Sequence, residues 1–136
     1  MEPYKKLLVL LIMIYLHILD DFVLQNCLVK LKQKDHWADI VKDHPLYKYD
    51  YIMALIAHAT EWTTTVSIPI FISFFIKPAD TFLKVSFLLI YIMTIVLHAY
   101  IDNRKANVKD INLIIDQFLH VIQTIGLWFV FCGIWN

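Results

Sequence analysis

Four long apolar stretches alternate with shorter polar segments along the 136-residue chain. A helix of about 20 apolar residues crosses a bilayer, because each residue advances the helix axis by about 1.5 Å. Consecutive crossings run in opposite directions, so the expected fold class is all-α, an integral membrane antiparallel four-helix bundle with residues 1–136 as one domain. We place the four helices at about residues 6–28, 50–76, 81–102 and 111–135.

The segment between the first two apolar stretches, residues 29–49, is the most polar part of the chain. Lysines alternate there with aspartates, while Trp37 and the apolar residues after it keep a spacing of three and four residues. This pattern predicts a short helix that lies in the membrane interface, with its indole at headgroup depth. Pro45 is expected to end that helix. We assign His36 and His44 to this solvated segment.

Each apolar stretch also carries polar side chains at helical spacing. In the first stretch, His17, Asp21 and Gln25 are four residues apart and therefore share one helix face. A charge at mid-bilayer depth costs roughly 2.5–3.5 kcal/mol on insertion scales, so these side chains should face other helices and not lipid. The other stretches repeat the pattern with His58 and Glu61, with His98 and Asp102, and with Asp116 and His120.

The position of each polar stripe along its helix adds a second constraint. The stripes lie in the second halves of the first and third helices, and in the first halves of the second and fourth. Because the helices alternate in direction, all four stripes should reach the same end of the bundle and form one shared site. Asp20 points about 100° away from Asp21, so we expect it to face a neighbouring helix or to support a ligand.

The shared site would contain four imidazoles and the carboxylates of Asp21, Glu61, Asp102 and Asp116. Carboxylates crowded into an apolar cavity repel each other and stay protonated unless a cation compensates them. One or two divalent metal ions would supply that charge, and mixed nitrogen and oxygen ligands suit zinc first, with manganese or iron as alternatives. The predicted metal ligands are His17, Asp21, His98, Asp102, Asp116 and His120.

Other polar residues receive roles around the metal. The candidate catalytic residues are Asp21, His58 and Glu61. The candidate supporting or substrate-binding residues are Gln25, His58, Lys105 and Gln117. Two further interpretations of the stripes stay open at this point: a buried hydrogen-bonded network without metal, and a path for protons or ions.

Composition agrees with a membrane protein. The chain is 60% hydrophobic with a mean hydropathy of +0.61, whereas soluble domains are roughly 45–50% apolar. The formal net charge is zero, so nothing indicates binding to nucleic acid. Cys27 and Cys132 should lie at opposite membrane faces, about 30 Å apart. We expect both to be free, because a disulfide needs Cα atoms within about 7 Å.

Basic residues divide unevenly between the two sides of the predicted bundle. The segments 29–49 and 103–110 carry eight lysines and arginines, and the other side carries four. The side richer in basic residues faces the cytoplasm. The sequence therefore predicts a multi-pass protein of the inner (plasma) membrane, with both termini outside the cytoplasm and the shared site in the cytoplasmic half.

The polar positions resemble the pattern of a family of small bacterial and phage membrane proteins, known as domain of unknown function 3307. The resemblance spans residues 17–120, and Asp20 and Glu61 are not part of it. The family has no established activity, but a looser similarity to membrane-bound metal-dependent hydrolases suggests hydrolysis. The matching positions are His17, Asp21, Phe22 and Gln25, then His58, then His98, Asp102 and Lys105, and last Asp116, Gln117 and His120.

The expected function is metal-dependent hydrolysis of a membrane-associated ester or phosphoester, because a divalent ion lowers the pKa of bound water and so supplies a nucleophile. Lys105 and Arg104 stand where an anionic, lipid-linked substrate would enter, although we favour their role as ordinary cytoplasmic-side charges. The alternative is a non-enzymatic phage or bacterial membrane protein that acts on a host membrane partner, or a transporter that moves ions or protons along the His/Asp chain.

Overall fold

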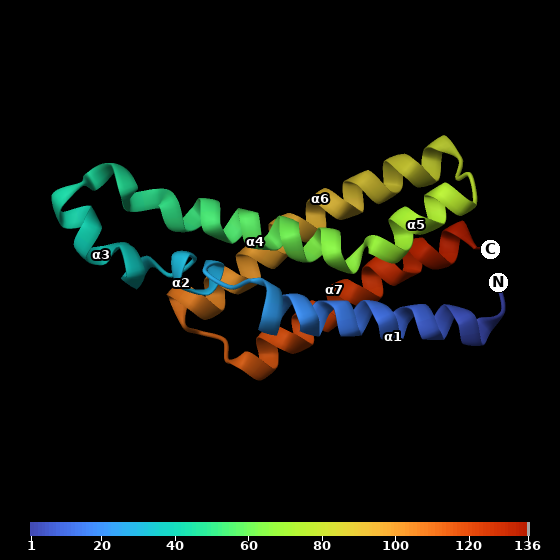
Figure 1. Ribbon diagram of the computed structural model, residues 1–136, viewed down its shortest axis with the longest axis horizontal. Helices are drawn as coiled ribbons and strands as arrows, with labels where there is room; N and C mark the ends of the chain where they lie inside the picture. Colours follow the sequence, from blue (N-terminus) through green and yellow to red (C-terminus); the bar gives the residue numbers. More distant parts are fainter. Residues whose placement is uncertain (136) are drawn as a thin grey trace.

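The computed structural model describes residues 1–135, and this part of the chain is entirely helical, with seven α-helices and no strand (Figure 1). Asn136, the last residue of the predicted domain, lies outside the described residues. The α-helices are α1 (Pro3–Leu19), α2 (Leu28–Leu31), α3 (Lys34–Asp43), α4 (Asp50–Val66), α5 (Ile68–Ile76), α6 (Thr81–Asn103) and α7 (Leu113–Ile134). The π-helices η1 (Asp20–Leu24) and η3 (Arg104–Val108) extend α1 and α6, and the 3-10 helix η2 (Pro45–Tyr49) precedes α4.

Local sequence accounts for several helix boundaries. The Asp80 carboxylate accepts a hydrogen bond from the backbone N–H of Leu83 at 2.7 Å and caps α6, and the Asn112 side chain does the same for α7. These are short polar residues that satisfy N–H groups left free in the first turn of a helix. In the loop between η3 and α7, Lys109 has a φ of 62°, a left-handed conformation that ends η3.

The second predicted helix is one bent pair and not a single rod. The continuous helical segment of η2 and α4 is bent by 47° relative to α5, and Ser67 lies at the break between the two. Pro69 stands in the first turn of α5, where it lacks an N–H and its ring clashes with the carbonyl four residues earlier. This proline accounts for the kink, which turns α5 away from the line of α4.

Three helical segments are long and apolar enough to cross a membrane, namely Pro3–Leu24, Thr81–Val108 and Leu113–Ile134. The bent pair Pro45–Val66 and Ile68–Ile76 would make a fourth. Large apolar side chains cover much of the outer surface, and Phe75, Phe82 and Ile114 are among the most exposed. Extensive exposed apolar surface marks a region that contacts lipid or another apolar partner.

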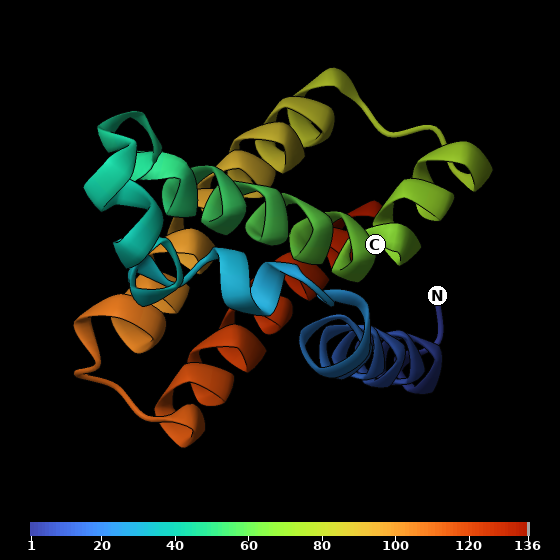
Figure 2. The same cartoon turned by 60° about the vertical axis from the view of Figure 1, so that its left-hand side comes forward.

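Met1 and the C-terminal end of α7 lie at one end of the molecule, and α2 and α3 lie toward the other (Figure 1). The N-terminal ammonium donates a hydrogen bond to the Trp135 carbonyl at 3.2 Å, which ties the two ends together. The principal helix contacts are α4 with α6, α1 with α7, and α6 with α7. The turned view shows α2 lying over the region where the long helices meet (Figure 2).

The predicted polar segment does contain a helix. Helix α3 ends at Asp43, one residue before His44, and Pro45 begins the next helical turn, as the position of that proline predicts. The imidazoles of His36 and His44 are exposed, so neither belongs to the interior. Cys27 and Cys132 are both free, as the sequence analysis predicts.

The interior at the end that holds the chain termini is apolar. Its buried side chains pack from α1, α4, α5, α6 and α7 into one cluster. Aromatic rings meet there edge to face, as Phe71 and Phe87 do with centroids 5.4 Å apart. The fully or largely buried members are Met13, Trp62, Val66, Ile70, Phe87, Leu127, Val130, Phe131 and Ile134.

Candidate metal centre

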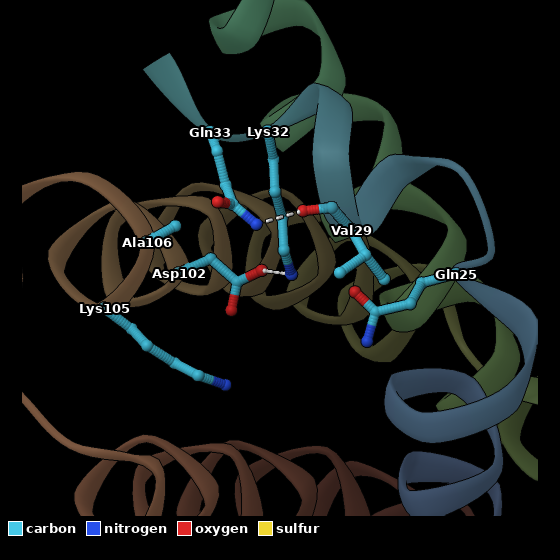
Figure 3. Close-up of a pocket in the computed structure, with 7 residues that line it drawn as sticks. All are labelled: Gln25, Val29, Lys32, Gln33, Asp102, Lys105 and Ala106. Atoms are coloured by element: carbon cyan, nitrogen blue, oxygen red, sulfur yellow. Dashed lines mark hydrogen bonds and ion pairs between the residues drawn. The ribbon is translucent and has the colours of Figure 1, made fainter. Parts of the chain in front are cut away.

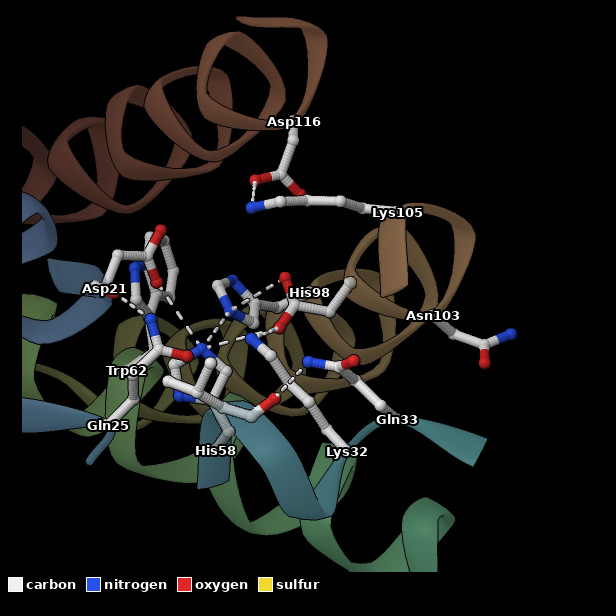
Figure 4. Close-up of polar contacts among 12 residues, drawn as sticks. Asp21, Gln25, Lys32, Gln33, His58, Trp62, His98, Asn103, Lys105 and Asp116 are labelled. Carbon is white, nitrogen blue, oxygen red and sulfur yellow. Dashed lines mark hydrogen bonds and ion pairs between the residues drawn. The ribbon is translucent and has the colours of Figure 1, made fainter. Parts of the chain in front are cut away.

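The other end of the interior is built from ionisable side chains, and all four long helices contribute. Each histidine or aspartate of the cluster is buried, with at most 8% of its surface exposed. Figure 4 shows several of them converging between the helices. The members are His17, Asp20 and Asp21 from α1 and η1, His58 from α4, His98 and Asp102 from α6, and Asp116 and His120 from α7.

Two groups of three residues hold possible ligand atoms within 4.8 Å of one another. The first group is Asp21, His58 and His98, and the second is His98, Asp102 and His120. In the first, His58 Nε2 lies 3.4 Å from His98 Nε2 and 3.4 Å from Asp21 Oδ1. A tetrahedral zinc site with bonds of about 2.0–2.1 Å separates neighbouring ligand atoms by about 3.3 Å, so these spacings suit a shared ion.

Ring orientation separates the two groups. The imidazoles of His58 and His98 meet edge to face, with an interplanar angle of 62°, and their Nε2 atoms lie 3.4 Å apart. The rings of His98 and His120 instead stack with centroids 4.0 Å apart and planes 22° apart. His120 Nε2 also lies 3.2 Å from Asp102 Oδ1 and 3.4 Å from Asp116 Oδ1. The first group is therefore the better metal cradle, and His120 is suited to bridging two carboxylates.

Two lysines compensate half of the buried carboxylates. Lys32 Nζ donates to Asp102 Oδ2 at 2.5 Å, and Lys105 Nζ donates to Asp116 Oδ2 at 2.6 Å. Figure 4 shows the second of these contacts, between Lys105 of η3 and Asp116 of α7. In both aspartates the other oxygen, Oδ1, faces His120. Each carboxylate therefore joins a lysine on one side to an imidazole on the other.

Lys32 lies in the segment 29–49 that the sequence predicts to be solvated, and the structure corrects this prediction for Lys32. Only 9% of the residue is exposed. Asn107 holds its backbone in place, because the Asn107 amide donates to the Lys32 carbonyl at 3.0 Å. The spacing of Gln25, Val29 and Lys32 by four and three residues was the available indication that this lysine continues the polar face of the first helix.

Trp62 is a second residue at the site that the polar stripes do not predict. Its indole N–H donates to His17 Nδ1 at 2.9 Å, and its ring stacks on His98 with centroids 4.3 Å apart. His17 Nδ1 lies 3.7 Å from Asp21 Oδ2. Among the described residues, His17 joins neither three-residue group, so the structure places it beside the cradle, fixed by Trp62.

Asp20 faces a neighbouring helix, as expected, and contacts His58 on the side of the ring away from the metal cradle. Its Oδ2 atom lies 3.8 Å from Nδ1 of His58, with both side chains fully buried. Neither atom has a hydrogen-bond partner within residues 1–135. A carboxylate behind a histidine favours the tautomer with its proton on Nδ1, which leaves Nε2 free to bind a metal. The widening of the chain into η1 begins at this residue, and π-turns often occur at functional sites.

The predicted supporting residues lie around the cradle. The Gln117 amide donates to Asp21 Oδ2 at 2.8 Å and to Asp116 Oδ2 at 3.2 Å. The Gln25 amide donates to the backbone carbonyl of Asp21. Glu61, a catalytic candidate, is half-buried and, among the described residues, belongs to neither three-residue group.

Arg104 does not point to the site entrance. Its guanidinium pairs with Asp110 and donates to the Tyr100 hydroxyl at 2.8 Å. The hydrogen bond from Arg104 lowers the pKa of Asp110 below its ordinary value. The nearby Lys109–Asp35 pair, at 2.8 Å, links the two loops at this end and lowers the pKa of Asp35 in the same way.

A cavity connects the cluster with the surface at the α2 end. It has a volume of about 290 Å³ and is lined by Gln25, Val29, Lys32, Gln33, Asp102, Lys105 and Ala106 (Figure 3). A smaller space of about 30 Å³ shares Lys32, Asp102 and Lys105 with it and also borders Asp21 and Gln117. A cavity with a volume of about 10–15 Å³ or more can hold a water molecule, so the smaller space has room for water beside Asp21.

Comparison with known proteins finds no match for this chain, whether among family models, curated protein sequences or solved structures. The resemblance to domain of unknown function 3307 therefore stays a prediction from the polar positions alone.

Proposed function

We propose that the chain is an integral membrane four-helix bundle that binds one divalent metal ion, zinc in the first place, and uses it to hydrolyse a membrane-associated ester or phosphoester. The observation that carries this proposal is the arrangement of Asp21, His58 and His98. Their ligand atoms come from three helices, and His58 Nε2 lies 3.4 Å from each of the other two, as in a tetrahedral zinc site. Asp21 also lines a water-sized cavity.

Formal charge also supports a single ion. With the four imidazoles counted as neutral, four buried carboxylates face two lysines, which leaves two negative charges in the cluster. One divalent cation cancels them, whereas two would leave an excess of positive charge. His98 belongs to both three-residue groups, but its Nε2 atom has only one lone pair and can bind one ion at a time.

Each residue around the proposed ion has a role that follows from its contacts. Asp20 would orient His58, and Gln117 would hold Asp21. The fourth position, next to the small cavity and Asp102, would stay open, as in catalytic zinc sites with three protein ligands. The ion would supply polarisation and a lowered pKa for a bound water, and Asp102 stands where it could accept a proton.

The hydrolytic proposal is tested with detergent-purified protein carrying zinc. Short-chain phospholipids, aryl phosphates and aryl esters would be assayed with the loaded protein, after chelation and with the Asp21→Asn variant. We expect turnover of at least one class that chelation abolishes and re-addition of zinc restores. Retained zinc without turnover of any class would overturn hydrolysis and leave the metal centre standing.

The membrane arrangement is part of the same proposal. Four crossings would place both termini on one side, which the contact between Met1 and Trp135 supports, and α3 would lie in the interface of the basic side. The excess of basic residues in the loops of that side favours the cytoplasm. A reporter that works only outside the cytoplasm should be active when it is fused to the C-terminus, and one that works only in the cytoplasm should be inactive there. The opposite result would reverse the predicted orientation.

A proton or ion path is the second candidate, because the polar contacts form a continuous chain. That chain runs from Asp20 through His58, Asp102, His120 and Asp116 to Lys105. It stops, however, at the buried apolar cluster that begins with Met13 and Trp62, which favours hydrolysis over conduction. Proton flux across liposomes that contain the purified protein would support conduction and contradict this preference.

A further inference from the structure

The larger cavity beside the metal cradle is flanked by two ammonium groups. Lys32 approaches from the end of α2 and Lys105 from η3, and both line the larger and the smaller cavity. Figure 3 shows their side chains and that of Gln25 converging on the space beside Asp102. An anion in this space would therefore contact both lysines and lie next to the metal cradle.

Each ammonium keeps donors for a further partner. A lysine has three N–H donors, and within residues 1–135 each of these ammonium groups makes one hydrogen bond, to an aspartate. Two donors on each lysine therefore remain for an anion in the cavity. Together they suit the several oxygens of a phosphate group better than the two oxygens of a carboxylate. At about 290 Å³ the cavity also has room for the adjoining part of a phosphate ester.

We propose that this cavity binds the phosphate group of a phosphoester through Lys32 and Lys105, and that binding requires the metal ion. The inference rests on the proposed function for the presence of that ion. Without it, two uncompensated negative charges in the cluster repel a phosphate. With a divalent ion bound, the formal charge of the cluster is zero and the two lysines attract the anion.

Coupling between the two sites is reciprocal. If the ion strengthens phosphate binding, phosphate must strengthen ion binding by the same factor. Asp102 provides the physical connection, because its Oδ2 atom accepts a hydrogen bond from Lys32 and lies 3.5 Å from Nε2 of His58, a residue of the metal cradle. This arrangement assigns the substrate class, a phosphate ester, to the entrance of the cradle.

The test measures binding of inorganic phosphate to metal-free and zinc-loaded protein by calorimetry, with bound zinc determined separately. We expect phosphate to bind the zinc-loaded form at least about tenfold more tightly than the metal-free form. Lys105→Gln and Lys32→Gln should each weaken phosphate binding about tenfold or more, because a hydrogen bond to a charged group is lost. Zinc stoichiometry should stay unchanged in both variants.

Lys30→Gln is the matched control, because Lys30 belongs to α2 but is exposed and does not line the cavity. It should bind phosphate as the wild type does. Lys105 is 35% exposed, so its variant keeps the test valid if Lys32→Gln fails to fold. Competition by dihexanoyl phosphatidic acid would identify a lipid headgroup as the source of the phosphate, and phosphate binding without competition would identify a soluble phosphate.

The outcomes separate this inference from the proposed function. Zinc binding without phosphate binding, or phosphate binding that neither lysine variant weakens, would overturn the phosphate site and leave the metal centre intact. Equal phosphate affinity with and without zinc would overturn the coupling. Absence of zinc binding would overturn the metal centre itself.

Discussion

The two ends of the helical structure have opposite kinds of interior. Near the chain termini, side chains such as Leu127 and Phe131 fill the space between helices with apolar volume. At the other end, four histidines and four aspartates fill the same space with charged and hydrogen-bonding groups. The same helices pass through both, so the difference arises from where polar residues occur along each helix.

The two interiors differ in how much they depend on the positions of individual atoms. Apolar contacts are non-directional, and the stability lost when a buried apolar side chain is shortened depends mainly on the volume removed. The polar end depends on particular atoms, because a buried carboxylate without a partner is costly. In a bilayer, where lipid is as apolar as the helix surface, such polar contacts also help to fix which helices pack together.

The largest effect is expected from His98→Ala, which removes the histidine common to both three-residue groups. The variant should retain less than about a tenth of the bound metal, since only two ligands of either group remain. Elemental analysis of the purified protein measures this. His36→Ala is the control, because His36 is exposed on α3, and its metal content should equal that of the wild type.

Leu127→Ala tests the apolar end. Leu127 is fully buried, so the cavity left by its side chain should lower the free energy of unfolding by about 2–5 kcal/mol. Metal per folded chain should stay the same. Denaturant titration in detergent measures the first quantity and elemental analysis the second. Metal loss from the folded variant would show that the two ends are not independent.

Asp20→Asn sharpens the account of the polar end. The amide keeps the size of the side chain but loses the charge that faces His58 Nδ1, and loss of such a supporting carboxylate reduces metal affinity about 10–100-fold. Competition with a metal indicator measures the affinity. ¹⁵N NMR of the histidines should show a changed His58 tautomer. An unchanged tautomer with unchanged affinity would mean that Asp20 does not orient His58.

A double variant tests whether the polar end acts as one unit. His17→Ala alone should destabilise the protein, because Trp62 loses its hydrogen-bond acceptor. Added to His98→Ala, the same change should cost much less, since the site is already lost. Thermal unfolding of the four proteins measures the coupling, and additive costs would contradict a single unit.

The smallest effect is expected at the surface pair of Asp35 and Lys109. Lys109→Gln should leave metal content unchanged and alter thermal unfolding near neutral pH only slightly. The pairing lowers the pKa of Asp35. Its contribution is therefore complete above the ordinary aspartate pKa and disappears as the pH falls through the lowered value. A pH series of wild type and variant should converge at low pH.

The sequence was sufficient for the parts of the structure that depend on periodicity. Four apolar stretches with polar stripes at matching depths predicted that His58, His98, Asp102 and His120 would meet, and the structure brings them together. The bend near Pro69 and the end of α3 before Pro45 also followed from local chemistry.

The rest depended on long-range contacts that periodicity does not encode. Lys32 reaches Asp102 across 70 residues of sequence, and only the position of α2 over the site makes that contact possible. Trp62 was indistinguishable from a packing aromatic until its N–H was found on His17. The π-turn of η1 likewise depends on the folded backbone, as does the approach of Asp20 Oδ2 to His58 Nδ1, two buried atoms that have no hydrogen-bond partner among the described residues.

Bound metal per chain tests the central claim most directly. Wild-type protein purified in detergent without chelator should contain one divalent ion per chain by elemental analysis. A chelator should remove the ion and lower the temperature of unfolding, and added zinc or manganese should restore the wild-type unfolding temperature. A folded wild type that holds no metal, and whose unfolding responds neither to chelator nor to added zinc or manganese, would contradict the metal centre.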